Sequence, residues 1–166
     1  YFTGLTFKPL DGGNESRITG LPAGVRIADY EWSRDSRHLA LTVVAATGIE
    51  LWLVDCATAG ARRLTDPILN AALGEPIVWI DHSTLAIRRV PAKRGAPPTA
   101  PGVPAGPVVQ ENLGQRAAAR TYDGLLANAH DEALFDYYAT SELALVTLDG
   151  TVTALPLRGL ITVVSP

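Results

Sequence analysis

The sequence lacks methionine, has a single cysteine (Cys56), and has only 19% charged residues among its 166 positions. One cysteine excludes an internal disulfide framework and a thiolate metal cluster. The net charge of −3 argues against a nucleic-acid partner, because such proteins normally carry a basic face. No apolar run approaches the roughly 18 residues that a membrane-spanning helix needs. Since 47% of the residues are hydrophobic, we expect a packed globular core and no membrane span.

Neither end of the sequence has the features of a natural protein terminus. The chain begins at Tyr1 without a start methionine or a signal peptide, and it finishes on the strand-like run 160–166. We therefore expect it to be a segment of a longer polypeptide.

A repeat of about 47 residues organises the sequence. Trp32 and Trp79 occupy equivalent places 47 residues apart, and Thr19 and Thr65 are 46 apart in another part of the repeat. Each copy has the strand-like, β-branched and aromatic segments, separated by turn residues, that are typical of short β-strands. In the first full copy we predict strands at 26–32, 38–44, 49–55 and 61–65. Four strands every 40–50 residues are typical of one blade of a β-propeller.

The repeat therefore predicts an all-β fold, an incomplete β-propeller that occupies residues 1–166. It would hold about two full four-stranded blades plus parts of two flanking blades, at residues 5–19 and 160–166. We expect the blade tryptophans to pack in the core or between blades. A propeller closes only with four or more blades, so this sector would have open sheet edges. Open edges predict self-association or docking onto the remainder of the polypeptide.

The second full blade carries a Pro-rich and short helical insertion at residues 91–141, where the first has only the turn 45–48. Six of the twelve prolines lie in 91–107, which predicts an extended strap without regular structure. The second half of the insertion predicts a short helix over 131–138, entered from Asn128 or His130 and acidic in its first turn.

Several stretches resemble a known family. Residues 32–41 are similar to the Trp-Ser-Pro-Asp-Gly blade motif of prolyl oligopeptidase-family serine peptidases, and 106–112, 120–126 and 130–141 resemble its glutamyl endopeptidase-like branch. The resemblance implies a propeller that lies over an α/β-hydrolase domain with a Ser-Asp-His triad and restricts access to short or flexible peptides. Arg34 and Ser36 depart from the usual Pro and Gly of the blade turn, and serine suits a left-handed turn less well than glycine.

The sequence carries no sign of catalytic machinery of its own. It contains no Gly-x-Ser-x-Gly motif, and no spacing of histidine, cysteine and carboxylate side chains fits a metal site. We therefore expect no catalytic residue, no metal and no cofactor. Asp55, Asp81 and Asp149 are expected to form turns.

The resemblance implies that the insertion is the part that touches a peptide substrate. Guanidinium groups there would pair with an acidic side chain of the substrate. The candidates are Arg88, Arg89, Arg94, Arg116 and Arg120, of which Arg94, Arg116 and Arg120 are preferred. Alternatively, Asp131 and Glu132 would bind a substrate amine, as paired acidic residues do in the related dipeptidyl-peptidase branch. A third interpretation is that these charges are solvated or attach the strap to the blades.

The resemblance predicts a non-catalytic propeller segment of a serine peptidase. It would gate and position peptides, cleaved after Glu, for a hydrolase domain elsewhere in the polypeptide. Its partners would be that hydrolase domain, the other blades and the peptide substrate. The alternative is a propeller scaffold for protein–protein binding without peptidase activity. We expect a periplasmic or secreted bacterial protein.

Overall fold

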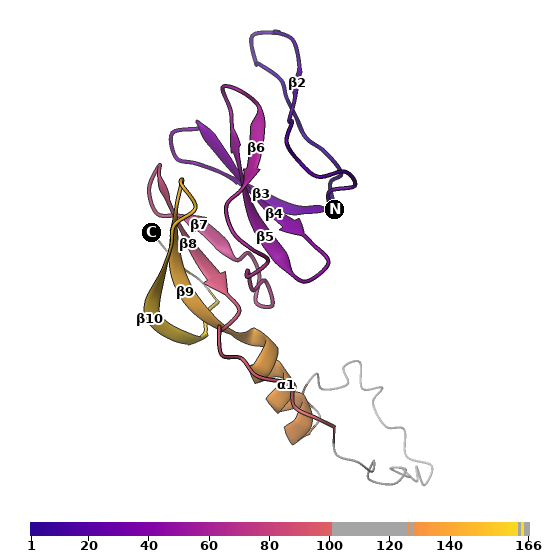
Figure 1. Ribbon diagram of the computed structural model, residues 1–166, viewed down its shortest axis with the longest axis vertical. Helices are drawn as coiled ribbons and strands as arrows, with labels where there is room; N and C mark the ends of the chain where they lie inside the picture. The colour runs from indigo at the N-terminus through magenta and orange to yellow at the C-terminus, as the bar shows by residue number, and fades with distance from the viewer. Residues whose placement is uncertain (101–125, 127, 163, 165–166) are drawn as a thin grey trace, which may run out of the picture. The chain divides into compact units, whose positions relative to one another are not determined.

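The computed structural model describes residues 1–100, 126, 128–162 and 164, and these residues form mostly β-structure (Figure 1). The strands are β1 (Thr6–Phe7), β2 (Ser16–Arg17), β3 (Ile27–Trp32), β4 (His38–Val44), β5 (Ile49–Asp55), β6 (Gly60–Arg63), β7 (Ile77–Trp79), β8 (Thr84–Arg89), β9 (Thr140–Thr147) and β10 (Val152–Leu160), with one helix, α1 (Ala129–Ala139). Within these ranges no helix is both long and apolar enough to cross a bilayer. The prediction of a mainly β fold is confirmed.

The chain divides into two compact units. Residues 1–92 and 139–166 form unit 1, and residues 93–138 form unit 2. Unit 1 contains two four-stranded antiparallel sheets with the strand orders β3-β4-β5-β6 and β7-β8-β9-β10, and a two-stranded sheet β1-β2. The described residues do not close into a propeller.

Two of the predicted boundaries differ from the structure. β9 begins at Thr140, so Thr140 and Ser141 are strand residues that pair with β10 and lie outside the insertion. At the other end, Leu160 closes β10, and Ile161 and Thr162 are not in a strand. The sequence pattern did not predict that β9 begins at Thr140, because Thr140 and Ser141 are polar. Their pairing with β10 depends on the folded sheet and not on the neighbouring residues.

The first four-stranded sheet is buried on both faces. Leu39 and Leu41 of β4 pack into a cluster with residues of the β1–β2 region, such as Ile18. Leu51 and Leu53 of β5 point the other way, into a cluster shared with the second sheet. Successive side chains alternate between the faces of a strand, so near-continuous apolar runs in β4 and β5 serve both interfaces.

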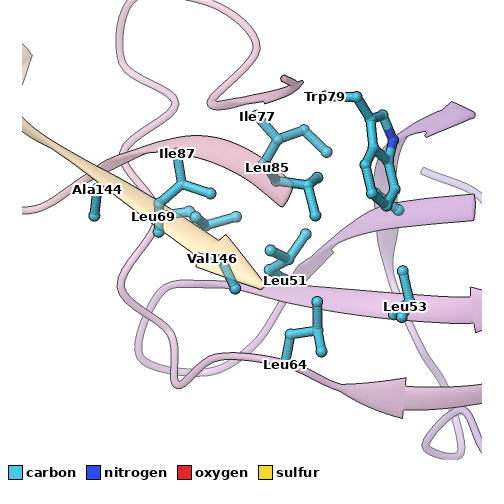
Figure 2. Close-up of a cluster of buried hydrophobic side chains, with 11 residues drawn as sticks. Leu51, Leu53, Leu64, Leu69, Ile77, Trp79, Leu85, Ile87, Ala144 and Val146 are labelled. Atoms are coloured by element: carbon cyan, nitrogen blue, oxygen red, sulfur yellow. The ribbon is translucent and has the colours of Figure 1, made fainter. Parts of the chain in front are cut away.

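The core between the two four-stranded sheets includes Trp79 at one end of the cluster (Figure 2). Only 2% of Trp79 is exposed, and its indole Nε1–H donates a 3.1 Å hydrogen bond to the main-chain carbonyl of Glu31 on β3. The other side chains of the cluster come from both sheets and from the segment between them. They include Leu51, Leu53, Leu64, Leu69, Ile77, Leu85, Ile87, Ala144 and Val146.

The repeat-equivalent Trp32 has a different environment. It is 46% exposed, and its ring contacts Phe7 of β1 with centroids 5.6 Å apart. Trp52 is partly buried, and its Nε1–H donates to Glu50 at 2.8 Å. The packing expectation is therefore confirmed for Trp79 and Trp52, whereas Trp32 is only half covered.

Aspartates shape the strand turns, as the sequence predicts. The Asp55 carboxylate accepts from the main-chain N–H and the hydroxyl of Thr58, and Asp81 accepts likewise from Ser83. Asp149 accepts from the hydroxyl of Thr147 and from the N–H of Thr151. These hydrogen bonds hold the pKa of each carboxyl below its ordinary value of 3.8.

The departure from the family turn motif at Ser36 has a visible consequence. Ser36 adopts φ of 59°, in the left-handed region that favours glycine, and its N–H donates to the Ser33 carbonyl at 2.9 Å. The turn therefore keeps the geometry that a glycine would give and forces a serine into it.

Replacing Trp79 tests the role of the inter-sheet core. Trp79→Ala should lower the free energy of unfolding by about 3–5 kcal/mol, because a fully buried aromatic side chain and its hydrogen bond are lost. Trp32→Ala removes the same side chain from a half-exposed site and should lower it by less than half as much. Urea unfolding followed by circular dichroism measures both variants, and equal losses would contradict the proposed difference between the sites.

Ser36→Gly should raise the free energy of unfolding by about 0.5–1 kcal/mol, because glycine adopts the left-handed conformation without steric penalty. Ser33→Ala in the same turn should lower it, since the Ser33 hydroxyl accepts from His38 N–H at 2.9 Å and donates to Asp35 at 2.7 Å. Thermal melts of the two variants give the comparison. A destabilised Ser36→Gly variant would show that the serine side chain is needed in the turn.

Candidate functional site

The insertion is rooted in a regular antiparallel ladder. Arg89 on β8 pairs in register with Glu142 on β9, and their side chains form a 2.8 Å ion pair in which each is 21% exposed. The Asn70 amide adds a 3.0 Å hydrogen bond to the Thr140 carbonyl. The two ends of the insertion therefore leave a well-ordered sheet.

Two of the candidate arginines are committed to this sheet. Arg88 is 3% exposed and donates to three main-chain carbonyls, those of Leu73 at 3.0 Å, Glu75 at 2.5 Å and Ile161 at 2.6 Å. Burial lowers its pKa. Arg88 donates to three carbonyls and Arg89 is paired with Glu142, so both guanidinium groups are engaged within unit 1.

Helix α1 of unit 2 begins with a side-chain cap at Asn128. The Asn128 Oδ1 accepts from the N–H groups of His130 and Asp131, at 2.9 and 3.0 Å. In return, the Asn128 amide donates to the Asp131 carboxylate at 2.9 Å. Asn128 thereby satisfies two N–H groups of the first turn, as an N-cap residue does. Asn128, one of the two predicted entry residues, is thus the cap, and Asp131 has a structural partner.

Arg94 lies in an aromatic corner at the opposite end of α1. Its guanidinium carbon is 4.1 Å from the ring centroid of Tyr137 and 4.9 Å from that of Tyr138. The two rings are nearly perpendicular, at 87°, with centroids 5.0 Å apart. The Tyr137 hydroxyl donates to the Gly95 carbonyl at 2.9 Å, which ties the helix to the segment that carries Arg94.

The structure separates the candidate charges of unit 2. Tyr137 in the last turn is six positions after Asp131 in the first, which corresponds to about 9 Å along the helix axis. Glu132 is exposed beside Asp131. The acidic pair and Arg94 therefore belong to different ends of α1. Arg116 and Arg120, also preferred from the sequence, lie outside the described residues.

A second polar cluster, not predicted from the sequence, lies where the edge strands β3 and β7 adjoin. It contains Asp29 and Glu31 on β3 and Glu75 before β7. A hydrogen bond to the Asp29 carboxyl, reinforced by burial, raises the pKa of Glu75 above its ordinary 4.5. Burial likewise raises the pKa of Glu31. Only folding brings these residues together, because they are about 45 positions apart in the sequence.

Within the part of the chain that is described, no group of three or more histidine, cysteine, aspartate and glutamate side chains is placed to hold a metal ion.

The sequence analysis names Arg94 as a candidate substrate contact but does not connect it with Tyr137 and Tyr138. An adjacent tyrosine pair near a helix end, with a cation in the facing strap, is the pattern that indicates stacking.

Two curated proteins are similar to this chain. One, from Oryza sativa subsp. japonica, is 39% identical over 165 residues, which covers 92% of this chain. The other, from Arabidopsis thaliana, is 40% identical over 179 residues, which covers the whole chain. Both are named "Probable glutamyl endopeptidase, chloroplastic", and the matched region is 18% of the length of each. No family model and no solved structure matches the chain.

The chain is thus related by sequence to proteins named as peptidases, as the resemblance implies. The expected location is wrong on this comparison. We expected a periplasmic or secreted bacterial protein, whereas both relatives are plant proteins whose names place them in the chloroplast.

The carboxyl cluster makes stability depend on pH in a defined direction. Folding favours the protonated form of Glu75, so its contribution is complete below the ordinary value of 4.5 and is lost as pH rises through its raised pKa. The turn aspartates act oppositely, because their lowered pKa values make stability fall as pH drops below 3.8.

Glu75→Gln should therefore flatten the loss of stability above pH 4.5, since its amide can donate to Asp29 at every pH. The acid limb, which depends on the turn aspartates, should stay as in the wild type. Urea midpoints measured across the pH range test both limbs. A parallel decline of the two proteins above pH 4.5 would exclude the Asp29–Glu75 hydrogen bond as its source.

Proposed function

We propose that this chain is a non-catalytic β-propeller sector of a serine peptidase of the prolyl oligopeptidase family, in its glutamyl endopeptidase-like branch. Its role is to gate and position peptide substrates for an α/β-hydrolase domain elsewhere in the polypeptide. The observation that carries the proposal is the similarity, at 39–40% identity, to two proteins named as glutamyl endopeptidases.

The sheet arrangement supports the propeller part of the proposal. Two sheets with the same sequential strand order pack face to face, and their first strands, β3 and β7, adjoin through the Trp79–Glu31 hydrogen bond. Farther out, Arg62 on β6 donates to the Leu148 carbonyl beyond β9. Contacts at both the first and the last strands are what successive blades of a propeller require.

The remaining partners follow from the exposed parts of unit 1. By its repeat position, Trp32 would receive a further blade as Trp79 receives the first sheet. Self-association through sheet edges is the competing possibility, but both outer edges carry features that discourage it. β6 is short and ends in Arg62 and Arg63, and β10 contains Pro156 and a register irregularity. We therefore favour docking onto the rest of the polypeptide.

The insertion supplies the positioning role. It emerges from the same end of β8 and β9 as the turn 45–48 does from β4 and β5, and it is anchored by the Arg89–Glu142 pair. Of the proposed substrate-binding residues, Arg94 is supported by its uncommitted guanidinium, and Arg116 and Arg120 by the resemblance alone. Asp131 and Glu132 are less favoured because Asp131 already accepts a hydrogen bond from the capping residue Asn128.

A loop exchange within the complete enzyme tests the gate. Residues 91–140 are replaced by Ala-Ala-Thr-Gly, so that Val90 and Ser141 are joined as Val44 and Ile49 are in the first sheet. Hydrolysis of a small chromogenic ester should stay within about twofold, since the reacting groups lie in another domain. The ratio of kcat/KM for a long unfolded polypeptide to that for a short Glu peptide should rise several-fold.

Three results bear on the proposal separately. An unchanged ratio in the exchanged enzyme would contradict the gating role. A complete wild-type protein without peptidase activity would contradict the peptidase assignment and favour the scaffold alternative. Triad-type hydrolysis by the 166-residue chain alone would overturn the non-catalytic role.

A further inference from the structure

The guanidinium of Arg94 has hydrogen-bonding capacity that the described structure leaves unused. Its Nε and Nη2 atoms are buried, yet neither has a hydrogen-bond partner. Among the ion pairs of the described residues, none involves Arg94. Arg88 donates to three carbonyls, and Arg89 pairs with Glu142 and leaves only its Nε without a partner, whereas Arg94 leaves two neighbouring nitrogens unused. Buried polar groups without partners are rare, and each calls for a physical explanation.

The two unused nitrogens are neighbours on one edge of the guanidinium. Nη2 is the terminal nitrogen trans to Cδ, so one of its N–H bonds runs nearly parallel to the Nε–H bond. Together they form a two-pronged donor whose spacing matches the two oxygens of a carboxylate. The two unpaired nitrogens therefore form one bidentate hydrogen-bond donor.

The tyrosine rings prepare this edge for a ligand. The guanidinium carbon lies over Tyr137 and Tyr138, at 4.1 and 4.9 Å, and these ring contacts provide its Nε and Nη2 donors with no oxygen acceptor. The Tyr137 hydroxyl is anchored on the Gly95 carbonyl, so the adjoining backbone and ring are held in place. A cation restrained in this way loses less conformational freedom on binding than a solvated arginine does.

We infer that the Nε–Nη2 edge of Arg94 binds a carboxylate group of a peptide ligand. This inference rests on the proposed function, which supplies peptides as the ligands, and it names the chemistry by which they are recognised. A carboxylate satisfies both donors with charge-assisted hydrogen bonds, whereas a side-chain amide offers one acceptor and no charge. Because both donor atoms are buried, a covering group has to move for a ligand to reach them, and we expect it to be Tyr138, which is 51% exposed.

The test is a binding titration of the chain with three matched pentapeptides, observed through the ¹H–¹⁵N signal of the Arg94 Nε–H group. The first peptide has a central Glu and an amidated end. The second has Gln in place of Glu. The third has the Gln sequence and a free terminal carboxylate. The Glu peptide should bind at least about tenfold more tightly than its Gln match and should shift the Arg94 signal downfield.

The third peptide distinguishes the two sources of a carboxylate. Binding as tight as that of the Glu peptide assigns the edge to a chain terminus as well, and weaker binding assigns it to an acidic side chain. Equal affinity of all three peptides, or an Arg94 signal that does not move, would overturn the inference.

Two variants distinguish bidentate hydrogen bonding by Arg94 from a general effect of positive charge. Arg94→Lys keeps a cation that can stack on the rings but loses the paired donors, and it should weaken Glu-peptide binding by about fivefold or more. Lys93→Gln removes the same charge from the neighbouring exposed position and should bind within about twofold of the wild type. Circular dichroism confirms folding in both. Wild-type affinity in Arg94→Lys would overturn the bidentate contact.

Failure of this inference can be told apart from failure of the proposed function. The titration needs no peptidase activity, so carboxylate binding in the chain stands even if the complete protein hydrolyses nothing. Conversely, a gated peptidase in which Arg94 binds no carboxylate would leave the proposed function intact and remove this inference alone.

Discussion

Burial of Trp79 between the two four-stranded sheets is the contact on which the rest of unit 1 depends. Its indole lies in the apolar core, and its single polar atom reaches the Glu31 carbonyl on the facing sheet. The hydrogen bond removes the penalty of burying an N–H group and sets the position of β7 against β3. Side chains of β5, β8 and β9 belong to the same buried cluster. Without that contact each sheet would expose an apolar face, since neither can cover both of its own.

The same arrangement explains how a long insertion is tolerated in a small sheet. β8 and β9 pair along their whole length, and the ladder ends in an ion pair at the root of the insertion. Order in the sheet therefore does not depend on the segment that leaves it. A rigid base that carries a distinct unit is the usual architecture for presenting a binding loop.

Three arginines near the root of the insertion have different environments, because each meets different groups in the folded chain. Arg88 points to a face of its sheet where loop carbonyls converge, and Arg89 pairs with a carboxylate on the adjacent strand. Arg94 lies beyond the sheet, where aromatic rings offer attraction to a cation but no hydrogen-bond acceptors. Sequence reasoning named all three as candidate substrate contacts and preferred Arg94 because of its place in the insertion that resembles the family. It did not predict their surroundings, because the partners of Arg88 and Arg94 are distant in the chain and carry no local signal.

The sequence by itself determined the mainly β fold, most strand positions, the turn aspartates and the existence of a helix in the insertion. These features depend on the alternation of neighbouring side chains, on turn chemistry and on capping residues, all of which are local. Only the tertiary structure decided that Trp79 is buried while its repeat partner Trp32 is half exposed, and that Asp29 and Glu75 come together. It also decided that Arg94 keeps two donors unused. Each of these features depends on which distant group contacts a side chain. A local sequence pattern is the same whether or not that group is present, so it does not predict the contact.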